Sequence, residues 1–161
     1  MRIGLGIDVH AFAGVEEGRP LILGGVALPY PQGLAGHSDA DVLVHAVMDA
    51  LLGAARLGDI GKHFPPTDPA YKDACSMELL RQVHSLLTQE GWRILDLDCV
   101  IIAEQPRLSP YREEMCANIA RALELATEQV GIKATTTEHL GFEGRGEGIS
   151  AYAVALLERG A

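Results

Sequence analysis

The amino-acid sequence predicts an α+β fold, a two-layer sandwich in which helices pack on one face of one mixed β-sheet. Segments with a two-residue apolar period alternate along the chain with segments of helical period. This strand-helix alternation favours one sheet covered by helices, and we expect a ferredoxin-like topology. A length of 161 residues suits a single domain, residues 1–161, around one core.

The first predicted strand runs from Arg2 to His10. We expect its odd, apolar positions to face the core and its even positions to face away from it. The odd set is Ile3, Leu5, Ile7 and Val9, and the even set is Gly4, Gly6, Asp8 and His10. A hairpin turning at Gly24-Gly25 is expected over 20–28, and further strands over 92–103, 132–136 and 148–158.

Helical periodicity predicts helices over 41–56, 73–90 and 111–128. Ser38 is the expected N-cap of the first helix, and Gly58 suits its C-terminal end. Three prolines between His63 and Ala70 predict a loop there.

Composition excludes several classes of protein. The 48% hydrophobic and 22% charged content is ordinary for a folded protein, and no apolar run approaches the ~18 residues of a membrane span. A net charge of −9 argues against a nucleic-acid partner. The three cysteines show no Cys-x-x-Cys spacing and the N-terminus does not resemble a secretory signal, so a cytoplasmic location is expected.

Two segments supply the ligand types of an open zinc site. Asp8 and His10 are two residues apart, so they share one face of the first strand. His45 lies on the polar stripe of the first helix, between Asp41 and Asp49. Two imidazoles and a carboxylate leave the fourth position of zinc for substrate or water. The residues alone also allow a simpler interpretation, in which the Asp-x-His spacing arises by chance and His45 binds no metal.

The later part of the chain contains groups suited to phosphate. Thr135, Thr136 and Thr137 offer hydroxyls to phosphate oxygens, and Glu138 a carboxylate to Mg²⁺. Residues 141–148 contain four glycines, which would let the backbone approach a ligand closely. A β-prone threonine run and a flexible turn are the alternatives. With no nucleophile motif of the Gly-x-Ser-x-Gly type, electrophilic activation of phosphorus is favoured over covalent catalysis.

Five stretches, in order along the chain, resemble the 2-C-methyl-D-erythritol 2,4-cyclodiphosphate synthase family of the non-mevalonate isoprenoid pathway. They are 2–10, 36–41 with His45, 53–68, 101–108 and 133–148. The resemblance implies a lyase that converts 4-diphosphocytidyl-2-C-methyl-D-erythritol 2-phosphate to the cyclic diphosphate plus CMP. The 2-phosphate of this substrate would attack its β-phosphorus.

The resemblance also implies partners and metals. It implies a homotrimer with sites between adjacent subunits, and zinc or another divalent cation at Asp8, His10 and His45. A second ion, Mg²⁺ or Mn²⁺, would bind the substrate diphosphate and Glu138. A cavity on the trimer axis, near Phe142 and Arg145, can hold isoprenoid diphosphates in this family.

Individual roles follow from the same resemblance. His37 and Thr136 would be catalytic. The implied substrate-binding residues are Asp8, His10, His37, Ser38, Asp59, Ile60, Gly61, Phe64, Ala103, Pro106, Arg107, Leu108, Ser109, Thr135, Thr136, Thr137, Glu138, Phe142 and Arg145. The chain departs from the usual family pattern at Pro66, Arg107, His139 and Tyr152.

Two other functions could use the same ligands. One is a zinc-dependent phosphohydrolase that uses a metal-bound water, and the other is a non-enzymatic module that binds a metal or an anion. Analysis of the products would separate these functions.

Overall fold

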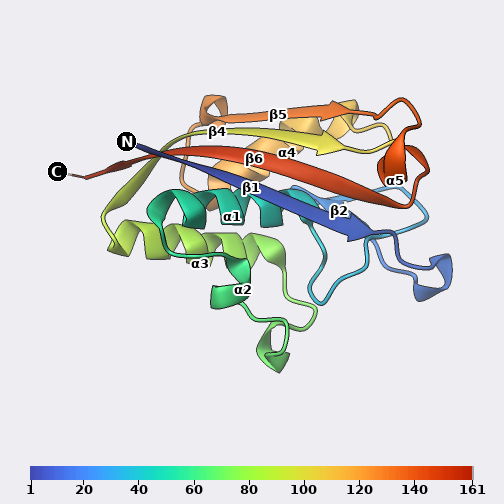
Figure 1. Ribbon diagram of the computed structural model, residues 1–161, viewed down its shortest axis with the longest axis horizontal. Helices are drawn as coiled ribbons and strands as arrows, with labels where there is room; N and C mark the ends of the chain where they lie inside the picture. The colour runs from blue at the N-terminus through green and yellow to red at the C-terminus, as the bar shows by residue number, and fades with distance from the viewer. Residues whose placement is uncertain (161) are drawn as a thin grey trace.

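A four-stranded mixed sheet forms one layer of the computed structural model, which describes residues 1–160. Its strands, in spatial order, are β1 (Arg2–Ala11), β6 (Gly148–Arg159), β4 (Trp92–Ile102) and β5 (Val130–Thr135). β6 is antiparallel to both neighbours, and β4 is parallel to β5. The helices α1 (Val42–Ala55), α3 (Ser76–Gln89) and α4 (Arg112–Ala122) gather on one side of the sheet (Figure 1). The predicted α+β class with helices on one face is confirmed.

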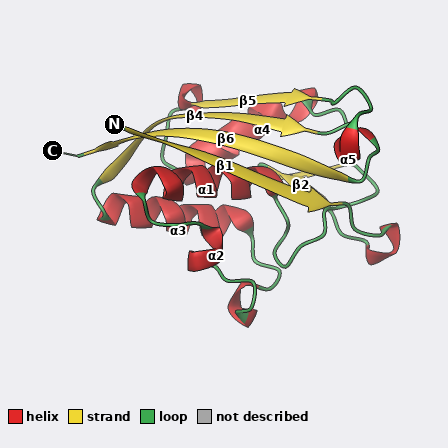
Figure 2. Cartoon of the chain, in the orientation of Figure 1, coloured by secondary structure: helices red, strands yellow, loops and turns green. Residues whose placement is uncertain are grey.

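Shorter elements connect these layers (Figure 2). β2 (Leu21–Leu23) and β3 (Val26–Leu28) form the predicted hairpin, in which Gly24 and Gly25 have φ of 56° and 72°. Both glycines occupy the left-handed region that a two-residue hairpin turn requires. The remaining helical turns are α2 (Ile60–His63), α5 (Gly141–Gly144) and the 3₁₀ turns Val15–Glu17, Pro69–Tyr71, Ser109–Tyr111 and Thr127–Gln129.

The expected ferredoxin-like topology is wrong in its connections. The order in the main sheet is strand-helix-strand-helix-strand-strand, because α4 lies between β4 and β5. A ferredoxin-like motif has strand-helix-strand-strand-helix-strand. β4 and β5 are parallel, and parallel neighbours need a crossover, which here is the helix α4.

The prediction for the two faces of β1 is also wrong. The odd residues are exposed, with Ile3 at 67% and Leu5 at 62%, whereas Gly4 and Gly6 are buried against α1. A Cβ on Gly4 would lie 2.0 Å from the Ala50 carbonyl oxygen, and one on Gly6 1.9 Å from that of Ala46. Only glycine lets the strand backbone approach the helix backbone so closely.

The exposed side of the sheet carries a contiguous apolar surface. Ile7 pairs with Tyr152 and Leu5 with Val154 across β1 and β6, and all four side chains are exposed. With Ile3 and Val9 they form the open sheet face, the name used below for these six residues. Among residues 1–160, no helix is both long and apolar enough to span a bilayer.

Several predicted helix ends shift. The N-cap of α1 is Asp41, not Ser38, and its C-cap is Arg56, with φ of 63°, not Gly58. Asp41 is fully buried and accepts hydrogen bonds from the backbone of Gly24, Gly25 and Val44. It therefore joins the start of α1 to the β2–β3 turn, a role that a surface N-cap would not have. α4 ends earlier than predicted, at Ala122, because Glu124 turns to a φ of 55°.

Candidate functional site

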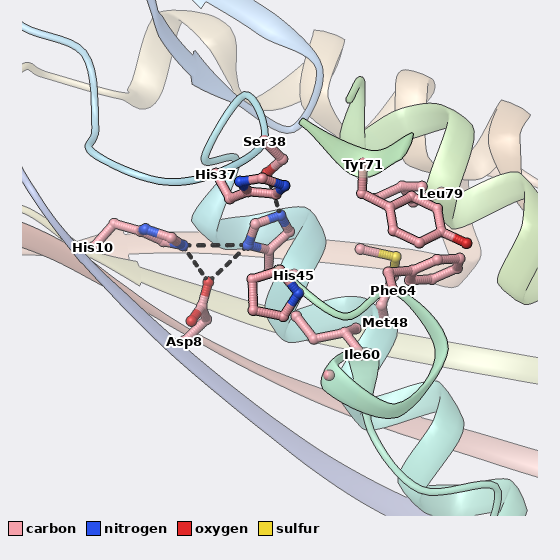
Figure 3. Close-up of a pocket in the computed structure, with 12 residues that line it drawn as sticks. Asp8, His10, His37, Ser38, His45, Met48, Ile60, Phe64, Tyr71 and Leu79 are labelled. Carbon is pink, nitrogen blue, oxygen red and sulfur yellow. Dashed lines mark hydrogen bonds and ion pairs between the residues drawn. The ribbon is translucent and has the colours of Figure 1, made fainter. Parts of the chain in front are cut away.

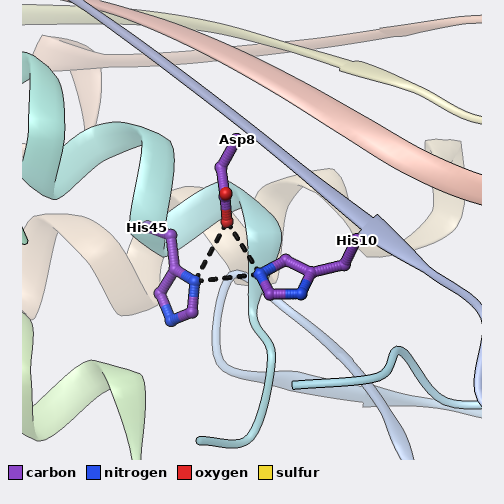
Figure 4. Close-up of side chains that lie close together, drawn as sticks. All are labelled: Asp8, His10 and His45. Carbon is purple, nitrogen blue, oxygen red and sulfur yellow. Dashed lines mark hydrogen bonds and ion pairs between the residues drawn. The ribbon is translucent and has the colours of Figure 1, made fainter. Parts of the chain in front are cut away.

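Asp8, His10 and His45 converge on one point at the end of β1 (Figure 4). His10 Nε2 lies 2.9 Å and His45 Nδ1 3.0 Å from the same oxygen, Asp8 Oδ2. The two ring nitrogens are 3.2 Å apart. The close approach of Gly4 and Gly6 to α1 brings the strand ligands to the helical histidine. Among residues 1–160, this is the only group of three or more His, Cys, Asp or Glu residues whose ligand atoms cluster closely enough for a metal ion.

The outer contacts of the two rings leave the converging nitrogens free. His10 Nδ1 lies 2.6 Å from the carbonyl oxygen of Ala35, an acceptor only, so Nδ1 carries a proton and, in the neutral ring, Nε2 presents a lone pair. His45 directs Nε2 toward the hydroxyls of Ser76 and Ser38, at 2.9 and 3.2 Å. A carboxylate and two imidazoles of this kind fit a divalent cation of the zinc type.

The cluster is strongly polarised. Burial opposes ionisation of Asp8, but hydrogen bonds from His10 and His45 outweigh it and lower the pKa of Asp8 to about 2. Burial likewise opposes protonation of His10, yet the hydrogen bond and charge of Asp8 raise the pKa of His10. Asp8 is therefore a carboxylate at any physiological pH, ready to bind a cation.

A cavity of about 290 Å³ opens beside the cluster (Figure 3). It brings together eight of the residues predicted for metal or substrate, which are Asp8, His10, His37, Ser38, His45, Ile60, Gly61 and Phe64. Asp59 stands next to this group and caps α2 by accepting a hydrogen bond from Lys62 N at 3.0 Å. The cavity thus joins a cation site to a largely apolar recess.

The sequence analysis missed part of this wall. Met48, Tyr71 and Leu79 were not among the predicted site residues, yet all three line the cavity together with Pro66. Met48 lies three residues after His45 on α1, so its helical spacing could have indicated a shared face. Tyr71 lies in the turn Pro69–Tyr71 and Leu79 in α3, and no local pattern links either residue to His45.

A second cavity, of about 390 Å³, lies at the ends of β4 and β5. Its lining includes the predicted residues Ala103, Pro106, Arg107, Leu108, Ser109, Thr135 and Thr136. Glu104 also lines it, and its Oε2 is a buried side-chain oxygen without a hydrogen-bond partner. The two cavities share no lining residue, so the predicted site residues are divided between two separate cavities.

The remaining predicted residues line neither cavity. Thr137 donates its hydroxyl to Leu140 O, and Glu138 is exposed with a φ of 53°. Phe142 is half-buried in α5, and Arg145 is exposed and paired with Glu147 at 2.9 Å. Glu138 stays outside the Asp8 cluster.

Comparison with known proteins connects this geometry to one family. The profile of the YgbB family matches residues 1–158. A 2-C-methyl-D-erythritol 2,4-cyclodiphosphate synthase from Geobacillus kaustophilus (strain HTA426) is 63% identical over 158 residues, which cover 98% of this chain and 98% of the relative.

Solved structures agree with this match. IspF of Plasmodium falciparum in complex with CDP superposes with a TM-score of 0.86 at 32% identity, over 99% of this chain and 97% of that chain. The bifunctional IspDF of Campylobacter jejuni superposes with a TM-score of 0.93 at 43% identity, and this chain spans 42% of its length. The chain belongs to the YgbB family, together with the 2-C-methyl-D-erythritol 2,4-cyclodiphosphate synthases.

Proposed function

We propose that this chain is a cyclodiphosphate synthase, a metal-dependent lyase that acts on 4-diphosphocytidyl-2-C-methyl-D-erythritol 2-phosphate. The products are 2-C-methyl-D-erythritol 2,4-cyclodiphosphate and CMP. The cyclic diphosphate is a precursor of isoprenoids. The observation that carries the proposal is the Asp8, His10 and His45 cluster beside the cavity of about 290 Å³, in a chain of this family.

The protein needs no nucleophile of its own, because the 2-phosphate of the substrate attacks the β-phosphorus. Asp8, His10 and His45 would hold zinc, and Glu138 with the substrate diphosphate would hold Mg²⁺ or Mn²⁺. When bound, these ions supply charge neutralisation and Lewis-acid polarisation of phosphate oxygens. The chain's own contribution is to hold the two phosphates within reach of each other, which is catalysis by positioning.

Thr136 and His37 are the proposed catalytic residues. Thr136 Oγ1 accepts a hydrogen bond from Glu138 N at 3.2 Å, so its own hydrogen is free to donate to a phosphate oxygen. Its place in the cavity at the ends of β4 and β5 suits the transferred phosphorus. His37 is exposed at the rim of the other cavity and can contact the erythritol phosphate there.

The cavity at 103–109 and 134–136 is the proposed site for the cytidine and its phosphate. Arg107 supplies a cation, and its Nε donates to Ser109 Oγ at 3.1 Å, which holds the guanidinium over this cavity. Thr135, Pro106 and Ala103 border it. The CDP in the complex of the Plasmodium falciparum relative supports a cytidine nucleotide as the ligand here.

A homotrimer would unite the two half-sites. The open sheet face is an apolar surface of the kind that marks protein contacts, which supports burial between subunits. The recess of one subunit would then meet the nucleotide cavity of its neighbour, and Phe142 and Arg145 would lie near the axis, where an isoprenoid diphosphate can bind. The three cysteines are free thiols, in keeping with a single domain of the cytoplasm.

Incubation of the purified protein with the substrate tests the function. We expect CMP and the cyclic diphosphate in equal amounts, and no CMP after the metal is removed with a chelator. A linear product that incorporates water would identify a phosphohydrolase, and absence of turnover a binding module. Either result would reject the synthase.

A further inference from the structure

His45 Nε2, the ring nitrogen that faces away from Asp8, contacts the hydroxyl of Ser76, a residue outside both cavities. His45 Nε2 lies 2.9 Å from Ser76 Oγ, in a buried contact at the first residue of α3. The side chain of Ser76 is fully buried. Ser76 lines neither cavity, so it does not touch the substrate pocket.

Ser76 is held in turn by a carboxylate. Its hydroxyl donates to Asp39 Oδ1, and its backbone N donates to Asp39 Oδ2 at 3.0 Å. Asp39 Oδ1 also accepts from Asp41 N at 3.2 Å. Asp39 thus accepts three hydrogen bonds, two of them from Ser76.

These contacts fix the direction of each hydrogen bond. A carboxylate only accepts, so the single hydrogen of the Ser76 hydroxyl goes to Asp39. Toward His45, the Ser76 oxygen can then act only as an acceptor. His45 Nε2 therefore donates to Ser76. In a ring with a single proton this leaves the lone pair on Nδ1, which faces His10 and the acceptor Asp8.

Ser38 cannot set this direction. Its Oγ lies 3.2 Å from His45 Nε2 and accepts from Ala40 N at 3.2 Å, but no carboxylate takes its hydrogen. Ser38 is therefore able either to accept from His45 or to donate to it. A donation would move the ring proton to Nδ1, into the cation site.

We propose that Ser76 and Asp39 are positioning residues that lock His45 in the tautomer able to bind a metal. The inference rests on the proposed zinc site and deepens it. Asp39 acts through Ser76, and Ser76 through His45, and neither residue lines either cavity. Mutation of a residue that hydrogen-bonds a metal ligand typically weakens metal affinity by roughly 10–100-fold.

Two variants test this relay, the hydrogen-bond chain from Asp39 through Ser76 to His45, at one residue each. Ser76→Ala removes the acceptor and leaves Ser38 free to donate. Asp39→Asn places an amide NH₂ either at the Oδ1 position, beside Ser76 Oγ and Asp41 N, or at the Oδ2 position, beside Ser76 N. In the first case the Ser76 hydrogen turns toward His45. Ser85→Ala, on the same helix, removes an exposed hydroxyl bonded to Arg81 O and is the matched control.

Zinc affinity is measured by chelator competition, and the His45 tautomer by nitrogen NMR of the metal-free protein at alkaline pH. We expect Ser76→Ala and Asp39→Asn to bind zinc roughly 10–100-fold more weakly, with His45 moving toward the Nδ1–H form. Ser85→Ala should match the wild-type protein in both measurements. Thermal unfolding shows whether each variant is folded, and if Ser76→Ala is not, Asp39→Asn decides.

Three outcomes would overturn the relay: an Nδ1–H tautomer in the wild-type protein, unchanged zinc affinity in folded Asp39→Asn, or weaker zinc binding with the tautomer unchanged. The last result would indicate a purely structural role. A wild-type protein that binds no zinc would reject the proposed metal instead, while the tautomer measurement would still decide the relay.

Discussion

His10 Nε2 and His45 Nδ1 lie 3.2 Å apart, each directed at the same oxygen of Asp8. Two unprotonated nitrogens and a carboxylate repel one another at this distance unless a proton or a cation lies between them. The metal-free protein resolves the conflict with a proton, as the raised pKa of His10 indicates. A divalent cation resolves it without one.

Replacement of His10 tests the cation site. His10→Ala should lose tightly bound zinc and turnover together, because two ligands remain of three, while the protein stays folded. Metal analysis and thermal unfolding measure the two effects. His84→Ala, in a half-buried position on α3 away from both cavities, is the control and should retain its zinc. A full zinc content in His10→Ala would contradict the assignment.

The pH dependence of the metal-free protein follows from the same pair. The pKa of Asp8 falls from 3.8 to about 2 on folding, so its stabilisation is present above pH 3.8 and is lost as the pH falls toward 2. The pKa of His10 rises above 6.5, so its stabilisation is present below pH 6.5 and is lost as the pH rises through the raised value.

Chelator-treated protein should therefore gain most from this pair between about pH 4 and 6.5, as measured by unfolding in denaturant. Asp8→Asn should flatten both flanks of the curve. Zinc should stabilise the wild-type protein increasingly as the pH rises, because protons compete for the same nitrogens. Identical pH profiles for Asp8→Asn and wild type would show that the pair does not contribute.

The contact between β1 and α1 predicts opposite effects at two glycines. Gly6→Ala should destabilise the protein by at least roughly 1–3 kcal/mol and weaken zinc binding, because the new Cβ would meet the Ala46 carbonyl at 1.9 Å. Gly53→Ala, in α1 with open space around its Cβ, should stabilise by about 0.5–1 kcal/mol. Denaturant unfolding and chelator competition measure both. Equal stability of the two variants would argue against the close approach.

Removal of the Thr136 hydroxyl tests its catalytic role. Thr136→Val keeps the branched shape and deletes one donor, which should lower turnover by roughly 10²–10³-fold and leave zinc content unchanged. Thr88→Val, which deletes an exposed hydroxyl on α3, should keep full activity. Near-normal CMP release by Thr136→Val would remove this residue from the catalytic set.

Complementation tests whether a site is shared between subunits. Asp8 and Glu138 belong to different parts of one chain, since Glu138 lies outside the metal cluster. Asp8→Asn and Glu138→Ala should each be inactive, and a refolded mixture should recover part of the activity if neighbouring subunits form the site. Light scattering should show a trimer. Recovery of no activity, with a trimer present, would place each site within one subunit.

Much of the metal site could be predicted because its signals are local. The alternation that puts Asp8 and His10 on one strand face and the helical spacing around His45 both hold in the structure. Ser76 could not be found in this way, because 31 residues separate it from His45 and only the packing of α3 against α1 brings them together. The residues proposed to bind the nucleotide were predicted from family motifs, and the structure gathers most of them in the cavity at two strand ends.

The error in β1 has a specific physical cause. Alternating apolar residues were assumed to face the core, but an apolar face is equally suited to another surface. Gly4 and Gly6 carried the contrary signal, because alternate glycines in a strand indicate a close backbone approach. The end of α4 gave no such signal, since Leu123 and Glu124 are good helix formers and only the backbone reveals the turn.

The contact of β1 with α1 is made between two backbones, so no side-chain rearrangement can adjust the spacing between Asp8, His10 and His45. Substitutions elsewhere in the core can be absorbed by changes of rotamer, but this spacing has no such freedom. The smallest unit that could be transplanted into another scaffold is therefore five residues, the three ligands plus Gly4 and Gly6. If only the three ligands were grafted, β1 would lie farther from α1, and His10 would no longer reach His45.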